Sequence, residues 1–228
     1  AVTVKSGEYV DGTNFDKLIE LTNQTGLNVE EVFGDKAYFR KPILDKIKGI
    51  GAKAYIPISE MAYKIDEEMF SYNKDSDEWF CSEGNITIRK KHRKDKSGKE
   101  TYKYYFEKEK CRNCSKRDEC KTGKNVCKIL EVGINTPEFY GYSQEQKTDE
   151  FKEKYKKRAC HEWKNGEMKN HHGLSRARGY GLRSMSTQAK LTAIAVNLKR
   201  IASILSSKLP QFLYVLRFNT KFYKKVAI

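Results

Sequence analysis

A glutamate, Glu162, lies in the middle of the basic stretch "YKKRACHEWKNGEMKNHHG" at residues 155–173. Arg158, Glu162 and Lys169 follow Tyr155 at offsets of 3, 7 and 14 residues, which on a helix places all four side chains on one face. That face is polar where a core-facing helix would be apolar. Two interpretations are open: a solvated helix with an ordinary Arg158–Glu162 ion pair, or a carboxylate that holds a metal ion beside groups that hold a polyanion.

A second carboxylate, Asp35, ends the predicted strand "LNVEEVFGDKAY". The helix "KPILDKIKGIG" and the strand "AKAYIPI" follow it, so the pattern predicts a parallel strand pair. Open α/β sheets place ligand-binding residues at the carboxyl ends of such strands. A Gly-Asp pair there can also simply make a turn. Together with Glu162 and its basic surroundings, however, Asp35 supplies the parts of a two-metal phosphoryl-transfer site, in which carboxylates hold Mg²⁺ ions.

Three regions surround these residues. Residues 1–58 predict an α/β region, because the strand "AVTVKSGEYVDGT" and the helix "NFDKLIELTNQTG", stopped by Gly26, precede the elements above. Residues 59–147 predict a β-rich insertion with strands in "NITIRKK" and "KETYKYYFEK". Residues 148–228 return to helix, with breaks at Gly173 and Gly179. The last predicted helix, "STQAKLTAIAVNLKRIASILSS", places one apolar stripe on its surface: Leu191, Ile194, Ala195, Leu198, Ile201 and Leu205.

The net charge of +15 resides in one part of the chain. Residues 151–228 hold 18 Lys and Arg against 3 Asp and Glu, so the first 150 residues are neutral overall. Clustered Lys and Arg bind polyanions because phosphate contacts release condensed counterions. This pattern favours a nucleic-acid partner over the alternatives of a solubilising basic surface or an anionic membrane.

No run approaches the roughly 20 apolar residues of a membrane span, and no secretory signal is evident, so we expect a cytoplasmic protein with no membrane partner. In a reducing compartment, cysteines favour metal binding or buried thiols over disulfides. Four thiolates complete a tetrahedral Zn²⁺ site. The candidate zinc ligands are Cys111, Cys114 and Cys120, completed by Cys127 or Cys81. The alternative is a set of reduced thiols in a small β subdomain.

Other side chains have simpler interpretations. Cys160 is expected to pack, and His171 and His172 precede the helix-stopping Gly173, where imidazoles favour the helix dipole. Trp163 and the tyrosines at 102, 104 and 105 can stack on bases, but packing is the favoured role for them.

Three motifs carry a resemblance to a known family. They are "GDKAY" at 34–38, the Tyr-x2-Arg-x3-Glu-x6-Lys signature at 155–169, and "HHGLSRARGYGL" leading to "AVNLKRI". Across residues 1–58 and 148–206 the chain resembles the C-terminal half of bacterial insertion-sequence transposases of the DDE class. The resemblance implies a ribonuclease H-like fold interrupted by a β-rich insertion before the helix that carries the Glu.

The resemblance also implies roles for single residues. Asp35 corresponds to the second catalytic Asp and Glu162 to the catalytic Glu, which together with a third carboxylate hold two Mg²⁺ ions. The implied DNA-binding residues are Tyr155, Arg158, Lys169, Arg176 and Arg178. The implied partners are the transposon ends and the target DNA.

One departure from the family concerns the first catalytic Asp, which the family carries on the first core strand. The start of this chain resembles the third strand, and Asp11 after it is interpreted as a turn or helix-start residue. We therefore expect a partial core without its early strands and an incomplete active site. An open sheet edge would favour self-association, for example as a homodimer. The alternative function is a non-catalytic DNA-binding module, or a decayed transposase remnant, with a zinc knuckle.

Overall fold

The computed structural model describes residues 2–8, 12–120 and 125–223, and for 208–223 it describes the helix backbone only. The described elements are helices and short strands, so the chain has the mixed α/β structure that the sequence predicts. None of the described helices combines the length and the apolar character that a membrane span needs.

The chain divides into two compact units. The continuous unit is Val29–Lys156, and the discontinuous unit combines Ala1–Asn28 with Lys157–Ile228. Asp35 belongs to the continuous unit and Glu162 to the discontinuous unit.

The continuous unit begins with two parallel strands joined by a helix. These elements are β1 (Glu31–Phe33), α2 (Lys41–Gly49) and β2 (Lys53–Tyr55). Pro42 lies in the first turn of α2, where its missing N–H leaves no hydrogen bond unmade. The helix buries Ile43, Leu44 and Ile47. The predicted strand–helix–strand segment with parallel pairing is confirmed.

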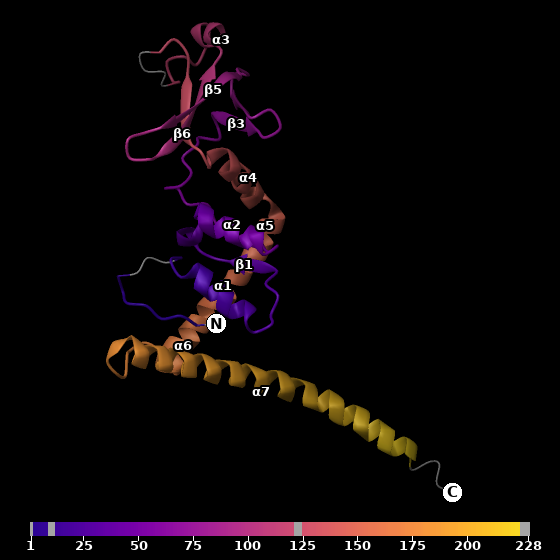
Figure 1. The fold of residues 1–228 in the computed structure, drawn as a ribbon. Coiled ribbons are helices and arrows are strands. Elements are labelled where there is room, and N and C mark those ends of the chain that lie inside the picture. Colours follow the sequence, from indigo (N-terminus) through magenta and orange to yellow (C-terminus); the bar gives the residue numbers. More distant parts are fainter. Residues whose placement is uncertain (1, 9–11, 121–124, 224–228) are drawn as a thin grey trace. The chain divides into compact units, whose positions relative to one another are not determined.

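Two small antiparallel sheets follow (Figure 1). One pairs β3 with β4, and the other has the order β5-β6-β7. Their bounds are β3 (Phe70–Asn73), β4 (Glu78–Cys81), β5 (Thr87–Lys94), β6 (Glu100–Phe106) and β7 (Ile129–Gly133), with the short helix α3 (Lys108–Arg112) between β6 and β7. They share one core cluster: Phe70, Trp79, Tyr104, Phe106, Leu130 and Val132. A single aromatic-rich core therefore joins both sheets.

The remaining described elements are helical. They are α1 (Phe15–Asn23), α4 (Thr136–Lys147), α5 (Asp149–Tyr155), α6 (Ala159–His171) and α7 (Gly181–Tyr223), with 3₁₀ turns η1 (Lys36–Tyr38) and η2 (Lys156–Arg158). The helix predicted to stop at Gly26 is confirmed as α1, and Gly26 has a φ of +74° that favours glycine. The last predicted helix is confirmed as part of α7.

One expectation about these elements is wrong, since residues 2–8 form no strand, and Asp11 lies outside the described residues. The apolar stripe of α7 is exposed, with Leu191 61% exposed and Leu198 59% exposed. Among the side chains of α7 that the structure describes, Ala189, Thr192 and Val196 are buried.

Among the described residues, the parallel sheet has two strands, β1 and β2. The ribonuclease H-like arrangement thus remains a prediction.

Candidate functional site

Asp35 lies directly beyond the carboxyl end of β1, one residue after Gly34. The Gly34 N–H continues the parallel ladder by donating to the Tyr55 carbonyl at 3.3 Å. Asp35 then caps η1, because its Oδ1 accepts a hydrogen bond from the Ala37 N–H at 3.0 Å. The side chain is half-buried at the strand end. Asp35 therefore makes the turn that one interpretation predicts, at the end of a parallel strand.

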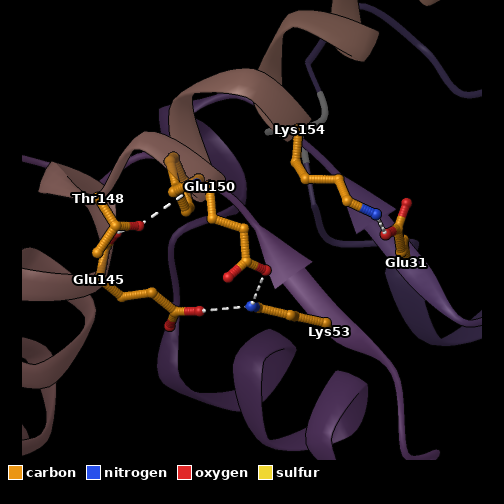
Figure 2. Close-up of polar contacts among 7 residues, drawn as sticks. Glu31, Lys53, Glu145, Thr148, Glu150 and Lys154 are labelled. Carbon is orange, nitrogen blue, oxygen red and sulfur yellow. Dashed lines mark hydrogen bonds and ion pairs between the residues drawn. The ribbon is translucent and has the colours of Figure 1, made fainter.

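Ion pairs attach α5 to β1, which precedes Asp35, and to β2, which follows α2 (Figure 2). Lys53 of β2 forms ion pairs with Glu145 at 3.2 Å and Glu150 at 2.9 Å, and Lys154 of α5 pairs with Glu31 of β1. The Glu150 hydrogen bond raises the pKa of Lys53 above its ordinary value. These contacts attach the helices just before Tyr155 to both strands of the parallel pair.

Aromatic rings add an apolar contact between the same elements. Phe33 stacks on Tyr55 with centroids 5.1 Å apart, Tyr55 contacts Phe151 at 5.6 Å, and Phe151 stacks on Tyr155 at 5.9 Å. We call these four rings the aromatic column. Ring packing therefore holds Tyr155 at the end of α5.

The Tyr155–Lys169 segment is not one continuous α-helix. α5 ends at Tyr155, the 3₁₀ turn η2 covers Lys156–Arg158, and α6 begins at Ala159. The single helical face predicted for all four residues is interrupted between Tyr155 and Arg158, since 3.0 residues per turn replace 3.6.

Glu162 lies in the first turn of α6 and pairs with Arg158, with Arg158 Nη2 3.0 Å from Glu162 Oε1. The Glu162 side chain is 60% exposed. Lys169 is exposed in the last turn of the same helix. The ion pair of the simpler interpretation is present, and the carboxylate also remains open to solvent.

The loop between α6 and α7, residues 172–180, presents two arginines, and we call it the arginine loop. Gln188 of α7 holds it: the Gln188 amide donates to the Gly173 and Arg176 carbonyls, both at 2.8 Å, and accepts from the Arg178 N–H at 2.9 Å. Gly173 has a φ of +71°, and the Arg178 guanidinium occupies the place where a side chain would stand. Arg176 and Arg178 are exposed on this fixed backbone.

Glu167 joins α6 to α7. It pairs with Lys164 on its own helix and with Lys199 on α7, both at 2.7 Å. These hydrogen bonds, the one from Lys164 first, lower the pKa of Glu167 to about 2. The carboxylate therefore stays charged across the physiological pH range.

Trp163 and Cys160 differ from expectation. Trp163 is 77% exposed and Cys160 is exposed, although packing was predicted for both. Both lie on α6, whose residues are nowhere buried, because its sequence is polar on all sides. Trp163 thus offers an aromatic face to solvent one residue after Glu162. Of the tyrosines, Tyr104 does pack in the core.

The cysteines are free thiols. Cys81, Cys111, Cys114 and Cys120 line one cavity, whereas Cys127 is buried and does not line it. Within the described residues, no group of three or more His, Cys, Asp or Glu side chains is arranged to hold a metal ion as it stands. The zinc expectation is therefore not supported by a formed coordination sphere.

Sequence reasoning missed the residues that hold α6, the arginine loop and α7 together. Gln188 and Glu167 act through long-range contacts, and neither sits in a spacing pattern that marks it. Phe151 was detectable, because it lies four residues before Tyr155 and so shares its side of a helix.

Comparison with known proteins adds a family assignment. A family model described as a transposase DDE domain matches residues 80–202, which is more than half of the chain. The match begins after Asp35 and contains Glu162 and the arginine loop. No curated protein and no solved structure matches the chain. A match over more than half of the chain shows that the chain belongs to the transposase DDE domain family.

Proposed function

We propose that the chain acts in DNA transposition as a metal-dependent DNA strand transferase, with Asp35 and Glu162 as carboxylate ligands. The observation that carries the proposal is Glu162, exposed on α6 within the family match and flanked by cationic side chains. Family membership supports DNA as the substrate.

The two carboxylates fit hard divalent cations. Asp35 uses Oδ1 to cap η1, and among the described residues no hydrogen bond or ion pair to Oδ2 is found, so this oxygen is available to a ligand. Among the described residues, Glu162 pairs with Arg158 at a solvent-exposed position. Oxygen ligands of this kind suit Mg²⁺. When bound, the ions would stabilise the attacking and leaving oxygens of an in-line displacement at phosphorus.

The reaction class follows from this chemistry. Water attacks first and frees a 3′-hydroxyl, which attacks the target strand second. Two-ion sites take carboxylates from about three positions, and Asp35 and Glu162 are the two that we assign in this chain.

The cationic side chains hold the DNA. The exposed Lys169, Arg176 and Arg178 contact phosphates, and Gln188 fixes the backbone from which both arginines project. Arg158 orients Glu162 until DNA or metal competes for it. Tyr155 also contacts the DNA, and the aromatic column holds its ring in place for that contact.

A non-catalytic DNA-binding module is the second candidate. The observation that favours it is that both carboxylates already have structural partners, since Asp35 caps η1 and Glu162 pairs with Arg158. In that case the site holds DNA without holding metal.

Metal binding separates the two candidates. Asp35→Asn keeps the acceptor for the Ala37 N–H, and Glu162→Gln keeps the side-chain size, so both remove charge with little change in structure. We expect Mn²⁺, used as a paramagnetic probe in place of Mg²⁺, to bind the DNA-bound chain and to bind at least tenfold more weakly to each variant. Glu153→Gln is the matched control, because Glu153 is an exposed carboxylate on α5 paired with Lys156.

Equal Mn²⁺ affinity in the native chain and both variants would exclude the catalytic assignment and leave the binding module. A cleavage assay in Mg²⁺ on a DNA substrate then adds a second readout. Nicking that survives Glu162→Gln would also contradict the assignment.

Trp163 supplies a direct test of the DNA-binding face. The chain has two tryptophans, and Trp79 is fully buried while Trp163 is 77% exposed. Single-stranded DNA should therefore quench the emission of Trp163 by stacking, and Trp163→Ala should remove the quenching and weaken binding about 5- to 100-fold, as expected for loss of one stacked base. Unchanged emission at saturating DNA would place Trp163 outside the interface.

A further inference from the structure

Four cysteines surround one cavity in the continuous unit. Cys81 ends β4, Cys111 lies in α3, and Cys114 and Cys120 lie in the turns that follow α3. The cavity has a volume of about 590 Å³, more than a metal ion fills. Sulfur atoms from three separate chain segments thus face a common space, although they do not yet form a coordination sphere.

Asn85 ties the two sides of this cavity together. Its Nδ2 donates to Cys111 Sγ at 3.2 Å and to the Glu107 carbonyl at 3.1 Å, while its backbone carbonyl accepts from the Cys81 N–H at 2.9 Å. Asn85 is 4% exposed, so these bonds are protected from water. An amide that donates to a cysteine sulfur stabilises the thiolate form, as outer-sphere donors do in metal sites.

The other two cysteines are also fixed by local hydrogen bonds. The Arg117 N–H donates to the Cys114 carbonyl at 3.3 Å, and the Cys120 N–H donates to the Lys116 carbonyl at 2.9 Å. Lys116 in turn pairs with Glu83 at 2.8 Å, which joins this turn to the loop after Cys81.

Charged side chains of both signs line the cavity: Lys110, Arg117 and Lys128, and Glu83, Glu107 and Glu109. The three cations lower the cost of a dianionic metal–tetrathiolate group.

We propose that Cys81, Cys111, Cys114 and Cys120 bind one Zn²⁺ ion tetrahedrally and that the cavity closes around it. Four S–H bonds break, four protons pass to solvent and four Zn–S bonds form, with no change of oxidation state. Cys127 takes no part, because it does not line the cavity. The ion links the end of β4 to the segment between α3 and β7, where a small subdomain has little core of its own. This inference does not rest on the proposed transposition chemistry.

Metal analysis of the full chain purified without chelator tests the proposal. We expect about one zinc per chain, and on exchange with Co²⁺ we expect the intense absorption of tetrahedral thiolate coordination. Cys114→Ser and Cys120→Ser should lose most of the zinc. Cys160→Ser, an exposed thiol on α6, and Cys127→Ala, a buried thiol outside the cavity, are matched controls that should keep it.

Thiol reactivity keeps the test informative if a serine variant fails to fold. In the native chain the four thiols should resist a thiol reagent until a chelator removes the metal, and then react as zinc appears in solution. Less than about 0.2 zinc per chain with four freely reactive thiols would overturn the proposal. So would a mass loss that reveals disulfides, iron as the bound metal, or equal zinc in Cys114→Ser and the native chain.

Discussion

Glu167 is a carboxylate of α6 that forms ion pairs within its own helix and with α7. Lys164 and Lys199 lower its pKa from an ordinary value of 4.5 to about 2, so the folded state binds this proton more weakly than the unfolded state. The stabilisation is therefore fully present above about pH 4.5 and is lost as the pH falls toward about 2.

The first prediction is that Glu167→Gln removes this pH dependence. The difference in free energy of unfolding between the native chain and the variant should be constant above about pH 5 and should shrink between about pH 4.5 and 2. Urea unfolding at a series of pH values measures it, and carbon NMR of the Glu167 carboxyl gives the pKa directly. A difference that grows as the pH falls would show that the pKa is raised.

At the scale of elements, α5 is held to the parallel pair by two kinds of contact whose strengths differ. Phe151 is a buried ring in the aromatic column, whereas Lys53 is a 44% exposed cation with two carboxylate partners. Losing a buried ring removes both its transfer free energy and its packing, while exposed ion pairs are screened by water.

The second prediction is that Phe151→Ala lowers the free energy of unfolding of the continuous unit by about 3–5 kcal/mol. Lys53→Ala should lower it by less than about 1 kcal/mol, despite the two ion pairs. Urea unfolding of the full chain measures both, with Phe151→Leu as a control that should retain much of the stability. A larger loss for Lys53→Ala than for Phe151→Ala would reverse this ranking.

Local signals explain which elements the sequence predicts. The segment with β1, α2 and β2 was predictable because its signals are local. They are its hydrophobic periodicity, Pro42 at the start of α2 and the glycine at 51 after its end. The position of Asp35 beyond a parallel strand followed from the same signals. The 3₁₀ turn at Lys156–Arg158 was not predictable, since no Gly or Pro marks it. The exposure of Trp163 and the Gln188 contacts depend on tertiary packing, which periodicity does not encode.

For the whole molecule, charge separation is the dominant feature. Residues 151–228 carry 18 Lys and Arg, whereas the first 150 residues have no net charge. Several of these cations have acidic partners, so the net excess lies with residues such as Arg176 and Arg178 of the arginine loop.

The third prediction is that DNA affinity falls steeply with salt. Each phosphate contact contributes a slope of about −0.9 in log K against log salt for duplex DNA, so Arg178→Ala should reduce the slope by about 0.9 and weaken binding without unfolding the chain. Fluorescence anisotropy at several salt concentrations measures this. Lys91→Ala, an exposed cation on β5, is the matched control and should leave the slope unchanged. Affinity that is independent of salt would show that the basic side chains serve only solubility.

The division into units also sets an order for folding during synthesis. All residues of the continuous unit, Val29–Lys156, are adjacent in the chain, so this unit can form its contacts as soon as its last residue leaves the ribosome. The discontinuous unit joins Ala1–Asn28 to Lys157–Ile228, so its first segment must wait until the second has been made. Closing so long a loop slows folding, because its entropy is lost before the contacts form. The nascent chain should therefore become resistant to proteolysis in two steps. The strands and the cysteine cavity of the continuous unit should be protected first, and α6, the arginine loop and α7 should be protected second.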